Sequence, residues 1–246
     1  MPAGSPRPAR VPREWFAGSH AHFSEVVRRR HDWGADYVWA LRSIRRGLVR
    51  RDVPESFSDG GLAPVLLVPG VLEEWTMMRP VAELLSAAGH PIHVLPELRR
   101  NTVGVVKAAS LGTAYLEAHD VRGVVVVAHS KGGLIGKQML LDDAAGRIDR
   151  MVAIATPFNG SHLAHLVPTP AIWPLRPSDP TIQALAARTD VNERIVSIYA
   201  AFDPHIPGGS ELPGAVNVPI DAMGHFRVMG HRDTLAAVEA AVSAEG

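Results

Sequence analysis

The 246-residue chain contains no cysteine, which excludes disulfide bonds and cysteine chemistry. The absence says nothing about the compartment, because a secreted enzyme can do without disulfides. Long apolar runs are missing too: no stretch of about eighteen apolar residues is present to span a membrane. The first thirty residues also lack the apolar core of a signal peptide. We therefore expect a soluble protein that, as written, is cytoplasmic.

The chain also lacks an overall charge, since 25 Lys and Arg balance 25 Asp and Glu. No global field attracts nucleic acid, so no nucleic-acid partner is expected. The first 51 residues are an exception, because eleven arginines and only four carboxylates give them a net charge of +7. A hydrophobic content of 46% with 20% charged residues is ordinary for a chain that buries a large core.

Sequence motifs for cofactors are absent as well. The chain has no glycine-rich phosphate loop and no dinucleotide-binding fingerprint. Three histidines, His162, His165 and His205, lack the carboxylate spacing that would support a metal site. We therefore expect no cofactor and no metal.

The most informative stretch is residues 123–139, which read GVVVVAHSKGGLIGKQM. Four valines predict a strand buried on both faces, and apolar residues recur at helical spacing after the turn. Ser130 lies at the apex, with the small residues Ala128 and Gly132 two positions to either side. A turn of this kind holds a serine hydroxyl clear of the sheet, beside a base and free backbone N–H groups. Ser130 is therefore the predicted nucleophile.

Strands and helices alternate through the rest of the sequence. Apolar runs predict further strands at 64–71, 91–95, 151–155, 194–199 and 215–219, and helical patterns cover 78–88, 102–119 and 232–242. The alternation predicts an α/β fold with a mostly parallel central sheet and helices on both of its faces.

The length fits one catalytic domain, predicted at 62–246, with an N-terminal extension at 1–61. Within the extension, residues 1–14 are expected to be loosely ordered. Residues 162–190 carry many prolines, which preclude long helices, and the segment is too long for an idle connection. It is either a lid or pocket wall, or a rigid surface crossing with Trp173 in the core.

A basic amphipathic helix is predicted within residues 24–51. Its apolar stripe consists of Tyr37, Leu41, Ile44 and Leu48. We favour packing of this stripe on the domain, with the arginines in water. The alternative is peripheral contact with an anionic membrane surface or with a partner.

A serine nucleophile needs a base, and the base needs an acid that orients it. Asp203 directly follows one predicted strand and His225 follows the next, so both fall at the same sheet edge as Ser130. The order nucleophile, acid, base along the chain is the one found with this kind of elbow. We therefore predict a triad of Ser130, Asp203 and His225.

Other acids and histidines lie near these positions: Asp179, Asp190, Asp221, His129, His205 and His231. Asp203 and His225 are preferred because each closely follows its strand. His129 is expected to point away from the nucleophile across the turn, in a structural role.

The oxyanion hole is predicted from two backbone N–H groups, those of Lys131 and Val71. Lys131 follows the nucleophile, and Val71 lies in the loop after the first strand, where Gly70 lets the backbone come close. The side chain of Lys131 is expected to be solvated. Candidate walls of an acyl pocket are Trp75, Met77, Met78, Phe158 and Trp173.

Four segments resemble the small bacterial lipases of the α/β-hydrolase superfamily. They are AHSKGG at the elbow, TPFNGS before His162, the acid loop IYAAFDPHIP and the histidine loop GAVNVPIDAMGH. The resemblance covers roughly residues 62–246 and implies the α/β-hydrolase fold and hydrolysis of carboxylic esters, lipid or acyl esters among them. Those lipases usually have a histidine where Pro69 stands and a hydrophobic residue where Lys131 stands; both departures leave the backbone donors in place.

Three alternatives to an esterase remain. An acyltransferase would use the same triad with an alcohol in place of water, and a thioesterase or amidase would differ in its pocket. A non-catalytic binding module would keep the fold and be tethered through the basic helix.

Overall fold

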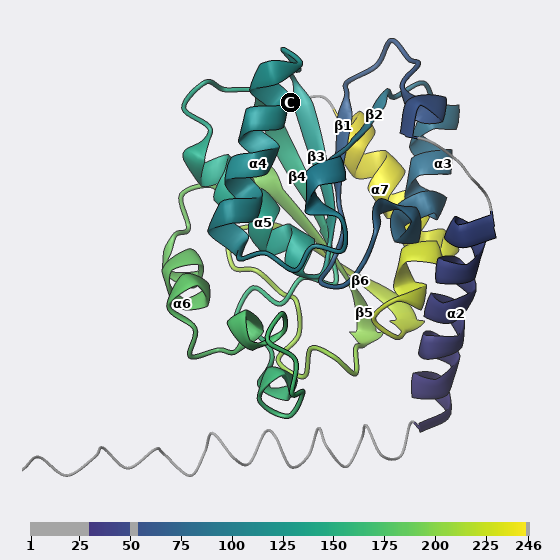
Figure 1. Cartoon of the computed structure of the whole chain (residues 1–246), viewed down its shortest axis with the longest axis vertical. Helices are drawn as coiled ribbons and strands as arrows, with labels where there is room; N and C mark the ends of the chain where they lie inside the picture. The colour runs from purple at the N-terminus through teal and green to yellow at the C-terminus, as the bar shows by residue number, and fades with distance from the viewer. Residues whose placement is uncertain (1–29, 50–53, 245–246) are drawn as a thin grey trace, which may run out of the picture.

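The computed structural model describes residues 30–49 and 54–244, and a six-stranded sheet lies at its centre (Figure 1). The strands are β1 (Val65–Val68), β2 (Ile92–Val94), β3 (Val124–His129), β4 (Ile148–Ile154), β5 (Ile195–Phe202) and β6 (Val216–Met223). They are arranged in the order β2-β1-β3-β4-β5-β6, and every neighbouring pair is parallel. The predicted parallel sheet is therefore confirmed. The segment 1–14, predicted to be loosely ordered, lies outside the described residues.

The valine run forms β3, which lies between β1 and β4 inside the sheet. Val124 and Val126 pack into the core on one face, and Val125 and Val127 into the core on the other. Successive side chains of a strand point to opposite faces, so only a strand covered on both sides can be apolar at every position. This explains why the run does not alternate with polar residues.

The helices cover both faces of the sheet, as predicted (Figure 1). Their bounds are α2 (Arg30–Val49), α3 (Arg79–Ala87), α4 (Val105–Ala118), α5 (Lys131–Asp142), α6 (Pro180–Ala187) and α7 (Arg232–Ser243). Side chains of α4, α5 and α6 pack on one face, and side chains of α2, α3 and α7 pack on the other. No helix in the described residues has the length and apolar character needed to cross a bilayer.

Seven short 3₁₀ helices interrupt the loops. They are η1 (Pro54–Phe57), η2 (Trp75–Met78), η3 (Pro96–Leu98), η4 (His162–His165), η5 (Trp173–Leu175), η6 (Asn192–Arg194) and η7 (Arg227–Gly230), counted in the described part of the chain. Three of them, η2, η4 and η5, contribute side chains to the cavity described below.

The last strand continues beyond its predicted end at Pro219. Pro219 pairs in register with Tyr199, and β6 runs on to Met223. Proline cannot donate to a sheet ladder, but β6 is an edge strand, where one side of the backbone needs no partner. The extension brings the end of β6 to within two residues of His225.

The proline-rich segment contains one helix, α6, in addition to η4 and η5. Pro180 occupies its first turn, where a missing N–H costs nothing, and the carboxylate of Asp179 caps it by accepting from the N–H of Thr181 at 2.8 Å. The prediction that prolines preclude long helices holds, since α6 has eight residues. One rival acid, Asp179, is thereby accounted for as a helix cap.

Helix α2 packs with a different face than its apolar stripe predicts. The buried positions are Asp36, Ala40 and Ser43, whereas Leu41 is 65% exposed and Ile44 is 45% exposed. The expected packing of the apolar stripe on the domain is therefore wrong for the part described; the side chain of Leu48 lies outside the described residues. Arginines 42, 45 and 46 are exposed, as expected. The boundary between the N-terminal extension (1–61) and the catalytic domain (62–246) stays a prediction.

The turn between β3 and α5 leaves no room for a side chain at Gly132, and this gives a stability prediction. A Cβ there would lie 2.0 Å from the carbonyl oxygen of Val68 in β1. Gly132→Ala is expected to lower the free energy of unfolding by about 3 kcal/mol or more, measured by urea denaturation.

Gly34 provides the matched control, because it is exposed within α2 and a Cβ there would meet nothing within 4 Å. Gly34→Ala is expected to raise the free energy of unfolding by up to about 1 kcal/mol. Equal stability of the two variants would contradict the close approach of α5 to β1.

Candidate active site

Ser130 occupies a strained turn at the carboxyl end of β3. Its backbone has φ 52° and ψ −122°, a conformation that a residue with a side chain rarely adopts. The next helix, α5, starts at Lys131, so the chain reverses within one residue. The side chain is 5% exposed and lies on the wall of a cavity. The sequence-predicted elbow is thus present, with its serine on the wall of the cavity.

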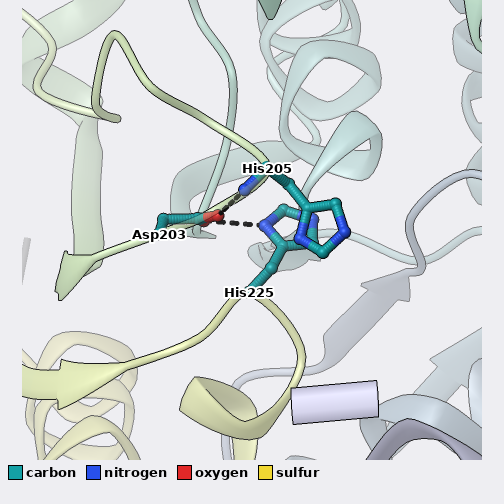
Figure 2. A group of neighbouring side chains, drawn as sticks. All are labelled: Asp203, His205 and His225. Carbon is teal, nitrogen blue, oxygen red and sulfur yellow. Dashed lines mark hydrogen bonds and ion pairs between the residues drawn. The ribbon is translucent and has the colours of Figure 1, made fainter. Parts of the chain in front are cut away.

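Asp203 and His225 come together with Ser130, although the three are far apart in sequence. The Nε2 atom of His225 lies 2.9 Å from Ser130 Oγ, and its Nδ1 atom lies 2.7 Å from Asp203 Oδ2. Figure 2 shows the Asp203 carboxylate directed at the His225 ring. A carboxylate only accepts hydrogen bonds, so Nδ1 carries the proton and Nε2 is free to accept one from the serine.

The second oxygen of Asp203 is held by the chain that follows it. Asp203 Oδ1 accepts from the backbone N–H of His205 at 2.8 Å and of Ile206 at 3.2 Å. Both bonds come from the loop after β5, and Figure 2 shows the one from His205. They fix the carboxylate so that Oδ2 faces the ring of His225.

The electrostatics of the pair favour a charged carboxylate and a basic imidazole. Burial works to raise the pKa of Asp203, but the neighbouring His225 and the hydrogen bonds to the carboxylate outweigh it, and the pKa is lowered. Burial works to lower the pKa of His225, but Asp203, and then Glu73 and Asp36, outweigh it, and the pKa is raised. The arrangement therefore stabilises a proton on His225.

The rival residues are placed elsewhere or otherwise engaged. Asp190 forms an exposed ion pair with Arg188 at 2.8 Å, and Asp221 is exposed. His231 caps α7, where its Nδ1 accepts from a backbone N–H. His205 lies beside His225, with ring centroids 4.8 Å apart, and burial lowers its pKa to about 3. His205 is therefore neutral at ordinary pH.

The two predicted oxyanion donors lie at the ends of adjacent strands. Val71 follows β1 and Lys131 follows β3, and the order of the sheet reverses between these strands. Val71 lines the same cavity as Ser130. Lys131 is the first residue of α5, where an N–H has no partner in the helix. Neither N–H donates a hydrogen bond within the described part of the chain.

The side chain of Lys131 is buried, which corrects the expectation of a solvated ammonium. It is 1% exposed, and its Nζ donates to the carbonyl oxygens of Asn101 and Val103. Burial lowers its pKa to about 8. Asn101, which the sequence did not single out, donates in turn to the carbonyl of Pro69 at 2.7 Å. Lys131 and Asn101 together anchor the loop that carries Val71.

A buried pair, Glu73 and His129, links the same loop to the histidine loop. Glu73 Oε2 accepts from the N–H of Gly70 and from His129 Nδ1, both at 2.9 Å. His129 Nε2 donates to the carbonyl oxygen of His225 at 3.0 Å. A carbonyl only accepts, so Nε2 carries a proton, and a further proton lies in the bond between Nδ1 and the carboxylate. His129 thus has the structural role expected for it, whereas nothing in the sequence pointed to Glu73.

The cavity beside Ser130 has a volume of about 590 Å³ and is lined mainly by apolar side chains. Helix α2 supplies one wall with Tyr37, Leu41 and Ile44, and the proline-rich segment supplies another with Leu163, Ala164, Val167, Ile172 and Leu175. Residues 162–190 therefore include a pocket wall, one of the two alternatives predicted for them.

Of the five predicted pocket residues, only Met77 lines this cavity. Met78 and Phe158 are buried in the two cores, and Trp75 faces a smaller hollow and packs on Phe57. Trp173 is 43% exposed and stacks with the guanidinium of Arg176. The prediction that these four residues line the pocket is therefore corrected. A large apolar side chain that is close to a site in the sequence can equally well pack in the core.

One group of three possible metal ligands occurs among the described residues: Asp203, His205 and His225. Their ligand atoms lie within 4.8 Å of one another, and Figure 2 shows the two rings side by side. Asp203 and His225 are already hydrogen-bonded to each other, and His225 to Ser130. The arrangement fits a hydrogen-bonded triad better than a cation site, because both carboxylate oxygens and both ring nitrogens of His225 are engaged.

Comparison of the sequence with protein-family models gives no match, and comparison with curated proteins gives none either. Solved structures do match. A Bacillus licheniformis lipase in its propeptide form superimposes with a TM-score of 0.60 at 15% identity, over 76% of this chain and 53% of that one. A monoacylglycerol lipase from Paleococcus ferrophilus has a TM-score of 0.54 at 18% identity, over 74% and 96%.

This chain has the α/β-hydrolase fold. It spans about half the length of the propeptide form of the Bacillus lipase, but 93% of the mature form. A deformylase from Pseudomonas putida with this fold also matches, with a TM-score of 0.54 at 15% identity over 74% of this chain and 93% of that one. The matched proteins are named for the cleavage of more than one kind of bond. The α/β-hydrolase fold by itself therefore does not indicate which kind of bond this chain cleaves.

The Glu73–His129 pair gives a second stability prediction. One oxygen of Glu73 takes both hydrogen bonds. A glutamine oxygen in its place could still accept from Gly70, but without the carboxylate a neutral imidazole at His129 has one N–H for two acceptors, that oxygen and the carbonyl of His225, so one hydrogen bond is lost. Glu73→Gln is expected to lower the free energy of unfolding by about 1 to 3 kcal/mol, measured by urea denaturation.

Glu74→Gln is the matched control, since Glu74 is adjacent and exposed. It is expected to change the free energy of unfolding by less than about 0.5 kcal/mol. A loss of the same size in both variants would show that the charge matters and the buried geometry does not.

Proposed function

We propose that the protein is a serine hydrolase that cleaves carboxylic esters. The observation that carries the proposal is the chain of hydrogen bonds that joins Ser130 Oγ, His225 and Asp203, with distances of 2.9 and 2.7 Å, beside an apolar cavity. A serine hydroxyl is a weak nucleophile unless a base accepts its proton, and this geometry supplies the base and the acid that orients it.

In the first half-reaction, Ser130 Oγ attacks the ester carbonyl carbon as its proton passes to His225 Nε2. The N–H groups of Val71 and Lys131 stabilise the negative oxygen of the tetrahedral intermediate. Each such donor contributes about 3 to 4 kcal/mol to transition-state stabilisation in enzymes of this type. The bond to the leaving alcohol then breaks, and the alcohol departs with the proton from His225, leaving an acyl ester on Ser130.

In the second half-reaction, water enters and loses a proton to His225 as its oxygen attacks the acyl carbon. The bond to Ser130 breaks, Ser130 Oγ recovers the proton, and the carboxylic acid leaves. Asp203 remains ionised throughout, because its role is to hold the imidazole and to stabilise its charged form.

The cavity supports an apolar acyl group as the part of the substrate that is bound. Its charged side chains are Glu73, Glu74 and Arg100, and Glu73 is already engaged with His129. The remaining lining is mostly aliphatic or aromatic, with half-exposed side chains of α2 toward the outside. The Bacillus and Paleococcus proteins with the same fold are lipases. Their similarity supports esters of fatty acids as the substrate class.

Removal of the nucleophile tests the proposal. Ser130→Ala is expected to abolish hydrolysis of a short p-nitrophenyl ester and labelling by a fluorophosphonate probe, because no other group replaces the attacking oxygen. Circular dichroism and thermal unfolding should match those of the wild type. Unchanged turnover in the variant would remove the nucleophile assignment, and a wild type that neither turns over esters nor takes the probe would favour a binding module.

The pH dependence follows from the raised pKa of His225. Below that pKa the imidazole is protonated and cannot accept the proton of Ser130, so kcat/KM is expected to fall with decreasing pH, with a midpoint above the ordinary value of 6.5. His205, with its pKa near 3, does not titrate in this range. The measurement is kcat/KM for a p-nitrophenyl ester from about pH 5 to 9; a midpoint below 6.5 would contradict the electrostatics described for the site.

A further inference from the structure

The strongest feature outside the triad is a buried carboxylate from helix α2. Asp36 is fully buried, and it accepts hydrogen bonds from three consecutive backbone N–H groups. Its Oδ2 accepts from His225 at 3.0 Å, and its Oδ1 accepts from Phe226 at 2.9 Å and from Arg227 at 2.8 Å. The chain that carries the base is therefore held by a residue 189 positions earlier.

The loop is shaped to receive this carboxylate. Gly224, directly before His225, has φ +108°, and a Cβ there would lie 2.4 Å from Asp36 Oδ1. The left-handed region suits glycine, and the missing side chain leaves the space that Asp36 occupies. The turn at Gly224 and the position of Asp36 thus depend on each other.

We propose that Asp36 is a positioning residue for the reaction, which holds the backbone of His225 so that its Nε2 faces Ser130. The proposal rests on the proposed function, since it assigns His225 as the base. It makes α2 part of the catalytic unit, although α2 precedes the predicted catalytic domain.

The peptide groups on both sides of His225 are held in this way. Its N–H donates to Asp36, and its C=O accepts from His129, which is bonded to Glu73. A base tethered only through its side chain could rotate or shift with its loop, and a displacement of about 1 Å can cost about 100-fold in rate. Asp36 and His129 approach the same residue from different elements, α2 and β3.

Helix α2 also contacts the acid loop, which supports its place in the site. The hydroxyl of Tyr37 lies 2.9 Å from His205 Nε2, and the ring of Trp33 stacks on His205 with centroids 6.1 Å apart. His205 follows Asp203 by two residues and donates its N–H to that carboxylate. The same helix therefore contacts the loops of both the acid and the base.

The charge of Asp36 has an effect separate from its geometry. The titratable groups around His225 are Asp203 and His205 from the loop after β5, Glu73 from the loop after β1, His129 from β3 and Asp36 from α2. His205, with its lowered pKa, is neutral. Asp203, then Glu73, and then Asp36 act to raise the pKa of His225, so each favours the imidazolium that forms during the proposed reaction.

The experiment compares Asp36→Asn with Asp32→Asn in the full chain. Asp32 is one turn earlier on α2 and pairs with the side chain of Arg227 at 3.2 Å, not with the loop backbone. Asp36→Asn is expected to lower kcat for a p-nitrophenyl ester by about 100-fold, with little change in KM, and to move the acid limb of kcat/KM to lower pH. Asp32→Asn should keep kcat within about twofold of the wild type.

A third variant separates charge from position. Asp36→Glu keeps the negative charge but places it one methylene farther along, so kcat should fall while the acid limb stays nearer to that of the wild type. A purely structural role would lower stability without moving the acid limb. Wild-type kcat and an unshifted acid limb in a folded Asp36→Asn variant would overturn the proposal.

Hydrogen exchange in the wild-type protein covers the case in which Asp36→Asn does not fold. The amides of residues 225–227 are expected to exchange slowly, at rates similar to those of β6, because a buried carboxylate holds them. Rapid exchange at these amides would overturn the proposal. A failure of the proposed function is distinguishable, because it would appear as a wild type without esterase activity or probe labelling, whatever the exchange result.

Discussion

The strained backbone of Ser130 depends on the packing of three neighbouring elements. A sparsely populated backbone conformation with positive φ costs a residue with a side chain about 1 to 3 kcal/mol, and it persists only where the surroundings impose it. Here β3 is paired along its length with β1 and β4, and Gly132 lets α5 press against the end of β1. The close approach that imposes the strain also brings the loop of Val71 beside Ser130. The strain at Ser130 and the position of the predicted oxyanion donor Val71 thus share one cause.

The sheet, the elbow and the positions of Asp203 and His225 were predictable because they follow from local patterns. Valine runs mark strands buried on both faces, and carboxyl ends of parallel strands meet at one edge. The five pocket residues were less predictable, since a nearby large apolar residue is equally suited to the core. Met78 and Phe158 pack there, and the cavity is lined instead by Leu41 of α2 and Leu175 of the proline-rich segment.

Helix α2 and Lys131 show why the burial of charged side chains is not predicted by a sequence pattern. Periodicity assigns the apolar stripe to the interior, but α2 turns Asp36 inward because three distant N–H groups satisfy its carboxylate. Lys131 is inward because two carbonyl oxygens accept from it. These partners lie from 28 to 191 residues away, so no window along the chain contains both halves of the interaction.

Two carboxylates outside the proposed triad reach the histidine loop, and they differ in their partners. Glu73 accepts hydrogen bonds from the N–H of Gly70 and from the ring of His129. Asp36 accepts from three backbone N–H groups of the histidine loop itself, and both carboxylates act to raise the pKa of His225. In a buried site such a charge acts with little screening. Because Asp36 comes from α2, the proposed catalytic unit extends upstream of the sheet, and the exposed apolar side chains Leu41 and Ile44 of the same helix line the cavity.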